Sequence, residues 1–173
     1  MADAGPFAEW VVAMQDGMRT GTGSNVPCDG CVACCTSGQT IPVDDDEVDL
    51  LPGHAMVAVG GEHVLAQEAG RCVLLVDGAC SAYEQRPRRC RTYDCRIFPA
   101  TGLTPEGDKP AIAERAARWR FTYETPEDRS RQTAVRLAAA TLRSVQVGGR
   151  GTSATQLAAA AVAAHEELLA DDC

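Results

Sequence analysis

The chain has 173 residues, a net charge of −8 and nine cysteines. A chain of this length can bury roughly 70% of its unfolded surface, so it can fold around a hydrophobic core without disulfides, and its cysteines fall short of the roughly 8–10% that marks a disulfide scaffold. The negative charge excludes a general nucleic-acid binder, because phosphate contacts need a basic face.

The N-terminal segment predicts a helix from Pro6 to about Arg19. Apolar residues recur there at helical spacing, behind a proline suited to a first turn: Phe7, Trp10, Val11, Met14 and Met18. The segment lacks a basic start, and Glu9, Gln15 and Asp16 interrupt it, so it matches neither a signal peptide nor a membrane span. We therefore expect a cytoplasmic protein with reduced thiols and no membrane partner.

Residues 20–27 are rich in Gly and Ser and predict a loop that leads into the sequence CDGCVACC. Cys28, Cys31 and Cys34 follow a C-x2-C-x2-C pattern, in which neighbouring thiolates can reach one ion. The same run opens the bacterial ferredoxin motif, whose next cysteine would fall at Gly38. The fourth thiolate must therefore come from Cys35 or from cysteines later in the chain.

Cys34 and Cys35 are adjacent, and successive side chains diverge in most backbone conformations. We expect them to serve different metals, with Cys35 reaching toward the later cysteines. The alternatives are that Cys35 completes a cluster begun by Cys28, Cys31 and Cys34, or that the pair is a redox dithiol. An iron-sulfur cluster offers several attachment points, so the pair favours such a cluster over two simple zinc sites.

The segment IPVDDDEVDLLPG predicts a short extended piece followed by a helix. Asp44 is the expected cap, Glu47 follows three residues later, and Pro52 and Gly53 stop the helix. We interpret the acidic run as a helix N-terminus, where carboxylates are stabilised by the helix dipole, and not as a metal site.

A second cysteine group lies between residues 70 and 98 and consists of Cys72, Cys80, Cys90 and Cys95. A short hairpin is expected around Asp77 and Gly78, and Ser81 to Glu84 has capping-box spacing for a helical turn that Pro87 interrupts. These elements could bring the four cysteines together. In a reducing compartment, the eight cysteines of both groups, with the C-x2-C spacing of the first, favour metal binding over disulfides.

Five arginines surround this second group: Arg86, Arg88, Arg89, Arg91 and Arg96. A tetrathiolate centre carries a charge of about −2, so guanidinium groups nearby would stabilise it. The alternative is ordinary surface pairing with Glu84 and Asp94.

The remainder of the chain predicts a helical scaffold. Helices are expected from Pro110 to Arg120, from a start at Thr125 to Gly148, and from Ser153 to Leu169, the second with an apolar stripe formed by Val135, Ala138, Leu142 and Val145. Alanine-rich faces should let the last two helices pair closely. Cys173 and the histidines at 54, 63 and 165 are expected outside any metal site, the histidines on surface or loop segments.

The motifs CDGCVACC, GRCVLL and CSAYEQRPRRCRTYDC resemble the CxxCxxCC (YkgJ-type) cysteine-cluster family over about residues 28–98. The resemblance implies a zinc- or iron-chelating domain. Its eight cysteines are Cys28, Cys31, Cys34, Cys35, Cys72, Cys80, Cys90 and Cys95. For members related to flagellin N-methylase it also implies methyl transfer from S-adenosylmethionine to lysine.

We expect an α+β, mostly helical, metal-centred single domain over residues 1–173, with a cysteine core at 28–98 and a helical scaffold at 108–170. The expected cofactor is an iron-sulfur cluster of the 4Fe-4S type, zinc, or both, with a redox or metal-dependent role. A protein lysine methyltransferase and a structural zinc module for protein interaction are the alternatives. The sequence leaves open whether the protein is an enzyme and which partner or substrate it has.

Overall fold

A computed structural model of the chain describes residues 1–22, 26, 30–145 and 152–170, the last five by their backbone alone. Cys28, Cys173 and the predicted helix stop at Gly148 and Gly149 lie outside these residues. The chain divides into two compact units, one formed by Met1–Arg19 with Cys95–Cys173 and the other by Thr20–Asp94. The mostly helical α+β fold class is confirmed, while the predicted domain boundaries remain a prediction.

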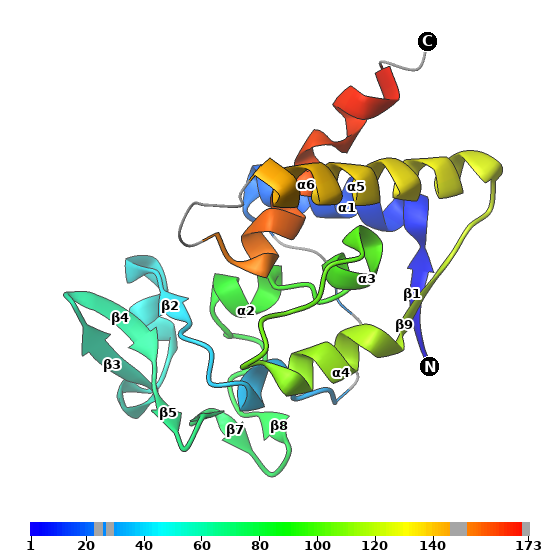
Figure 1. Cartoon of the computed structure of the whole chain (residues 1–173). Coiled ribbons are helices and arrows are strands. Elements are labelled where there is room, and N and C mark those ends of the chain that lie inside the picture. Colours follow the sequence, from blue (N-terminus) through cyan, green and yellow to red (C-terminus); the bar gives the residue numbers. More distant parts are fainter. Residues whose placement is uncertain (23–25, 27–29, 146–151, 171–173) are drawn as a thin grey trace. The chain divides into compact units, whose positions relative to one another are not determined.

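The first unit is mainly helical (Figure 1). Its elements in chain order are β1 (Ala2–Pro6), α1 (Phe7–Thr20), α3 (Ile97–Thr101), α4 (Pro110–Arg118), β9 (Trp119–Thr122), α5 (Pro126–Val145) and α6 (Ala154–Ala170). The helices predicted at the N-terminus and in the C-terminal part are confirmed. Among the described residues, no helix combines the length and apolarity needed to cross a bilayer.

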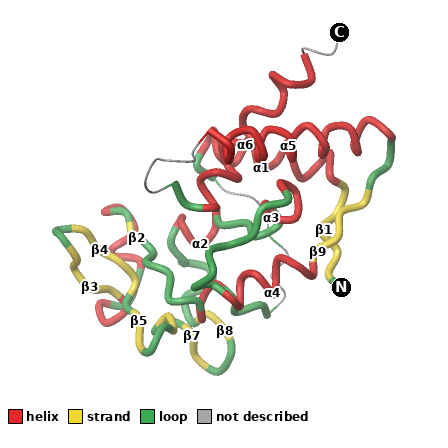
Figure 2. Tube along the Cα trace, in the orientation of Figure 1, coloured by secondary structure: helices red, strands yellow, loops and turns green. Residues whose placement is uncertain are grey.

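Strands β1 and β9 run parallel, with Ala2 opposite Trp119, and lie side by side in Figure 2. Aromatic packing joins this pair to α1, because the ring of Phe121 lies 5.2 Å from that of Phe7 and 5.1 Å from that of Trp10 between centroids. Aromatic pairs at such distances add to the free energy gained by burial. The two-stranded sheet therefore ties the start of the chain to a segment more than a hundred residues later.

Helices α5 and α6 pair through small side chains, as predicted. Ala138 and Ala139 of α5 pack with Ala161 of α6 in a buried cluster, and the two helices cross in Figure 1. Alanine faces permit this close approach. The end of the predicted apolar stripe is wrong, because Val145 is 78% exposed.

Both helices begin with reciprocal side-chain caps. The Thr125 hydroxyl accepts a hydrogen bond from the Asp128 backbone N–H at 3.3 Å, and the Asp128 carboxylate accepts one from the Thr125 N–H at 3.1 Å. Ser153 and Gln156 exchange the equivalent bonds at the start of α6. Such capping boxes satisfy N–H groups that would otherwise lack partners, which explains why these boundaries could be predicted.

The predicted location of His165 is wrong. It was predicted on a surface or loop segment, but its side chain is fully buried in α6, where Nδ1 lies 2.7 Å from the Val162 carbonyl oxygen. Helix α6 itself carries alanines on most of its sides, so its sequence shows little contrast between a buried and an exposed face.

The second unit consists of short strands and short helices. Its strands are β2 (Pro42–Val43), β3 (Met56–Val59), β4 (Glu62–Leu65), β5 (Gln67–Glu68), β6 (Arg71–Cys72), β7 (Leu75–Val76) and β8 (Ala79–Cys80). Antiparallel pairing gives the sheet β2-β4-β3 and the hairpins β5-β6 and β7-β8. The helical pieces are η1 (Cys34–Thr36), η2 (Asp45–Leu50), η3 (Gly53–Ala55) and α2 (Arg88–Thr92).

The predicted hairpin is confirmed at β7-β8. Asp77 and Gly78 have φ values of 50° and 79°, the left-handed pair that a tight two-residue turn requires. The predicted helical turn at Ser81 does not become a helix, because the Ser81 hydroxyl donates to the Leu74 carbonyl at 3.1 Å instead of capping. After this segment, the next helix is α2, which begins at Arg88 directly after Pro87.

Candidate metal centre

Four cysteines gather around the hydrophobic core of the second unit. Cys72 is part of this core together with Val43, Leu51, Ala55, Leu65, Leu74 and Ala82. The partly buried side chains of Cys35, Cys80 and Cys90 pack against the same core. Elements separated by more than fifty residues therefore bring their thiols to one place.

Each of the four thiols is carried by a different local structure. Cys35 lies in η1, Cys72 in β6, Cys80 in β8 and Cys90 in α2. The turn around η1 is held by hydroxyl groups, since the Thr36 hydroxyl donates to the Val32 carbonyl at 3.0 Å and Ser37 donates to the Ala33 carbonyl at 2.6 Å. Helix η1 contacts β6, which brings Cys35 toward Cys72.

Gly38 occupies the position where a ferredoxin-like run would carry a fourth cysteine. Its φ of 59° favours glycine over residues with a side chain, and its N–H donates to the Gly70 carbonyl at 2.9 Å. A Cβ at this position would lie 3.7 Å from the Gly70 Cα. The residue thus joins the first cysteine run to the β5-β6 turn and provides no ligand.

The thiols influence one another electrostatically. Burial, and after it the nearby thiols of Cys35, Cys72 and Cys80, raise the pKa of the Cys90 thiol to about 12, against the opposite effect of Arg86. Burial and Cys80 also raise the pKa of Cys72, against the effect of a hydrogen bond from the Leu74 backbone. Mutual repulsion between thiolates is what a bound cation would remove, because a metal ion favours the deprotonated form of every ligand.

The side chains are of the kind that bind zinc or iron, although their sulfur atoms are not arranged as the ligands of one metal ion. Within the described parts of the chain, no group of three or more His, Cys, Asp or Glu side chains has the arrangement of a preformed metal site. The described cysteines are present as thiols rather than as disulfides. Four thiols are the donor set of a tetrathiolate zinc ion and of a cysteine-bound iron-sulfur cluster.

The remaining predicted ligands lie elsewhere. Cys31 and Cys34 are partly buried in the second unit, at and just before η1, and Cys28 falls outside the described residues. Cys95 belongs to the first unit, where it is buried and its Sγ accepts a hydrogen bond from Trp119 Nε1 at 3.1 Å. A ligand role for these four cysteines remains a prediction.

Two of the arginines form ion pairs with the acidic run, which the sequence did not predict. Arg88 pairs with Asp44 at 2.7 Å and with Asp46 at 3.0 Å, and Arg91 pairs with Glu47 at 3.3 Å. The acidic run was predicted to act only as a helix start. The signal for the pairing was a matching block of opposite charge about forty residues away, which sequence alone does not place in space.

Arg86 has a different environment from the other arginines. Its Cζ lies 3.9 Å from the centroid of the Tyr83 ring, and its Nη1 donates to the Tyr83 carbonyl at 2.6 Å. Since Arg86 also lowers the pKa of Cys90, this residue fits the expectation of a guanidinium near an anionic centre.

A family model with the description "Putative zinc- or iron-chelating domain" matches residues 27–120, more than half of the chain. The chain belongs to the CxxCxxCC family. The CxxCxxCC match begins directly before Cys28 and ends one residue after Trp119, so it includes all eight candidate cysteines. Comparisons with curated proteins and with solved structures gave no significant match.

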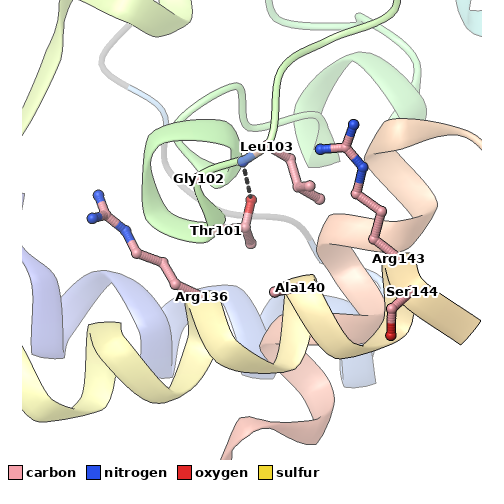
Figure 3. Close-up of a pocket in the computed structure, with 7 residues that line it drawn as sticks. All are labelled: Thr101, Gly102, Leu103, Arg136, Ala140, Arg143 and Ser144. Atoms are coloured by element: carbon pink, nitrogen blue, oxygen red, sulfur yellow. Dashed lines mark hydrogen bonds between the residues drawn. The ribbon is translucent and has the colours of Figure 1, made fainter.

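The first unit of this CxxCxxCC protein has a groove whose lining differs from the cysteine-rich core (Figure 3). Its lining consists of Thr101, Gly102, Leu103, Arg136, Ala140, Arg143 and Ser144. Arg136 donates to the Pro99 carbonyl at 3.2 Å, and Ala140 lies between the two arginines along α5. None of the lining side chains is a thiol, imidazole or carboxylate, so the groove offers no side-chain donor typical of a zinc or iron site.

Proposed function

We propose that this protein binds a metal centre through thiolates and that Cys35, Cys72, Cys80 and Cys90 supply the ligands of one centre. The observation that carries the proposal is the convergence of these four side chains on one core of the second unit. The family description, a zinc- or iron-chelating domain, supports metal as the bound species.

Cys28, Cys31 and Cys34 form the second chelating group in this proposal. Their spacing of two intervening residues lets each neighbouring pair hold one metal atom. Cys95 is the eighth proposed ligand, and the hydrogen bond that its sulfur accepts is the kind of contact that orients metal ligands.

The centre proposed here is an iron-sulfur cluster of the 4Fe-4S type, with zinc at one of the two groups as the second possibility. Adjacent Cys34 and Cys35 support the cluster, because several iron atoms can accept thiolates that point in different directions. Arg86 near Cys90 supports an anionic centre. Such a protein would act in redox or metal-dependent chemistry in the cytoplasm, where thiols stay reduced.

Anaerobic purification tests this proposal. The protein should retain iron with sulfide, or zinc, as measured by elemental analysis, absorption and electron paramagnetic resonance. Cys90→Ser should lower the metal content, whereas Cys173→Ser, at a position predicted to bear no ligand, should not. A well-folded protein with disulfides between these cysteines, no metal and no response to chelator would overturn the proposal.

A further inference from the structure

Glu47 is a buried carboxylate at the junction between the acidic run and α2. Its residue is only 3% exposed. Oε1 accepts hydrogen bonds from the Arg88 backbone N–H at 2.7 Å and from Arg91 Nη2 at 3.3 Å, and Oε2 accepts one from the Asp44 N–H at 3.4 Å. Three donors from two segments thus compensate the cost of burying this charge.

Helix α2 depends on contacts of this kind for its position. It is five residues long, and an isolated helix of that length is unstable in water. Pro87 precedes it, and the Arg88 N–H at its first position would have no helical acceptor. Glu47 provides that acceptor, while Arg88 also pairs with Asp44 and Asp46.

The same helix carries Cys90. The Cys90 N–H donates to the Pro87 carbonyl at 2.8 Å within the first turn of α2, and its side chain packs against the core that includes Cys72. Arg88, which Glu47 holds, therefore lies two residues before Cys90 in the same helix.

We propose that Glu47 is a positioning residue for metal binding, which holds α2 so that the Cys90 sulfur faces Cys35, Cys72 and Cys80. This inference rests on the proposed function. The carboxylate is fixed by the capping of η2, where Asp44 and Glu47 form a capping box, and it acts on Cys90 through the backbone of α2. Glu47 itself provides no metal ligand in this arrangement.

Substitutions at Glu47 distinguish this role from a general contribution to stability. Glu47→Gln preserves the volume and one carbonyl oxygen but removes the charge, and it places an amide donor against the donors of Arg91 or Asp44. Glu47→Ala removes the acceptor altogether. Asp49→Asn, on the exposed part of the same helix η2, removes an equal charge and serves as the matched control.

The test uses the full chain, reduced, stripped with chelator and titrated anaerobically with Co²⁺, with Zn²⁺ as competitor. The intensity of the cobalt-thiolate charge-transfer absorption reports how many sulfurs bind, and alkylation followed by mass spectrometry reports the protection of each cysteine. We expect Glu47→Gln and Glu47→Ala to weaken Co²⁺ binding by about 10- to 100-fold. Protection should be lost at Cys90 first, and Asp49→Asn should behave as wild type.

Two results would contradict the inference in different ways. A wild-type thiolate absorption that stays unchanged in Glu47→Gln, with Cys90 still protected, would overturn the role of Glu47 alone. A wild-type chain without any cobalt-thiolate absorption and without metal as purified would overturn the proposed function and this inference with it. If Glu47→Ala does not fold, Glu47→Gln, whose side chain has the same size, decides the matter.

Discussion

Trp119 Nε1 donates a hydrogen bond to Cys95 Sγ at 3.1 Å, and both residues are buried. The guanidinium of Arg115 lies over the same indole, with its Cζ 4.2 Å from the ring centroid. An N–H group directed at sulfur stabilises the thiolate, and hydrogen bonds to ligand sulfurs raise the reduction potential of an iron-sulfur cluster. Trp119 therefore orients the Cys95 side chain through its sulfur.

Trp119→Phe removes this donor while it keeps an aromatic ring. If Cys95 is a metal ligand, the substitution should lower the reduction potential of a bound cluster, or weaken zinc binding by about tenfold or more. Trp10→Phe, in the aromatic cluster around Phe7 and Phe121, is the control and should leave both quantities unchanged. Equal potentials and affinities in wild type and Trp119→Phe would show that Cys95 is not a ligand.

The helices of the first unit could be predicted because their signals are local. Thr125 with Asp128 and Ser153 are capping residues that can be recognised within four positions of the chain. The pairing of β1 with β9 could not be predicted, since β1 has the sequence ADAGP, which has low β-propensity. The Phe7 and Trp10 rings that pack against Phe121 of β9 are brought to it only by the fold.

The spacing of the cysteines marks them as candidate metal ligands, but their surroundings in the fold could not be predicted. Two intervening residues between cysteines indicate chelation directly. The contact of Arg88 with Asp44 joins residues 44 positions apart, and no periodicity in the sequence indicates it. For the same reason Glu47 could be predicted as a capping residue but not as the acceptor for the first N–H of α2.

The capping box of α5 gives a prediction that is independent of metal. Asp128→Ala should lower the free energy of unfolding by about 0.5–2 kcal/mol, because the Glu124 and Thr125 N–H groups lose their acceptor. Glu127→Gln, exposed in the same first turn, should cost only about 0.3–1 kcal/mol. Urea unfolding measures both values. A larger loss for Glu127→Gln would contradict the assignment of Asp128 as the cap.

Metal binding should release protons and should strengthen as the pH rises. The pKa of Cys90 is raised to about 12 and that of Cys72 is also raised, so both are neutral thiols near pH 7 in the metal-free protein. Ligand thiols must lose these protons, so a site with four cysteines should release about four protons per ion. Calorimetric titration with Zn²⁺ in buffers of different ionisation enthalpy counts them. Binding without proton release would show that thiols are not the ligands.

The same shift contributes to the pH dependence of the metal-free fold. Because the pKa of Cys90 is higher in the folded chain than its ordinary value of 9.0, folding favours the protonated thiol. Its contribution to stability is fully present below about pH 9 and is lost as the pH rises toward about 12. Cys90→Ser should flatten this part of the curve of unfolding free energy against pH. An unchanged slope in the variant would assign the loss to other groups.

Substitutions of Cys34 and Cys35 can be compared directly, because these two neighbouring thiols are expected to bind different metal centres. Cys35 packs against the core that holds Cys72, so Cys35→Ser should reduce the metal bound by that group and leave the Cys28, Cys31 and Cys34 run loaded. Cys34→Ser should have the opposite effect. Elemental analysis together with alkylation of individual cysteines separates the two groups.

The competing arrangement places Cys35 in a single cluster with Cys28, Cys31 and Cys34. In that case Cys35→Ser would abolish the cluster absorption, and alkylation would show continued protection of Cys72, Cys80 and Cys90. We expect the divided arrangement, because the Cys35 side chain packs against the same core as Cys80 and Cys90 and helps to raise the pKa of Cys90. A cation bound by both thiolates would relieve the repulsion that raises this pKa.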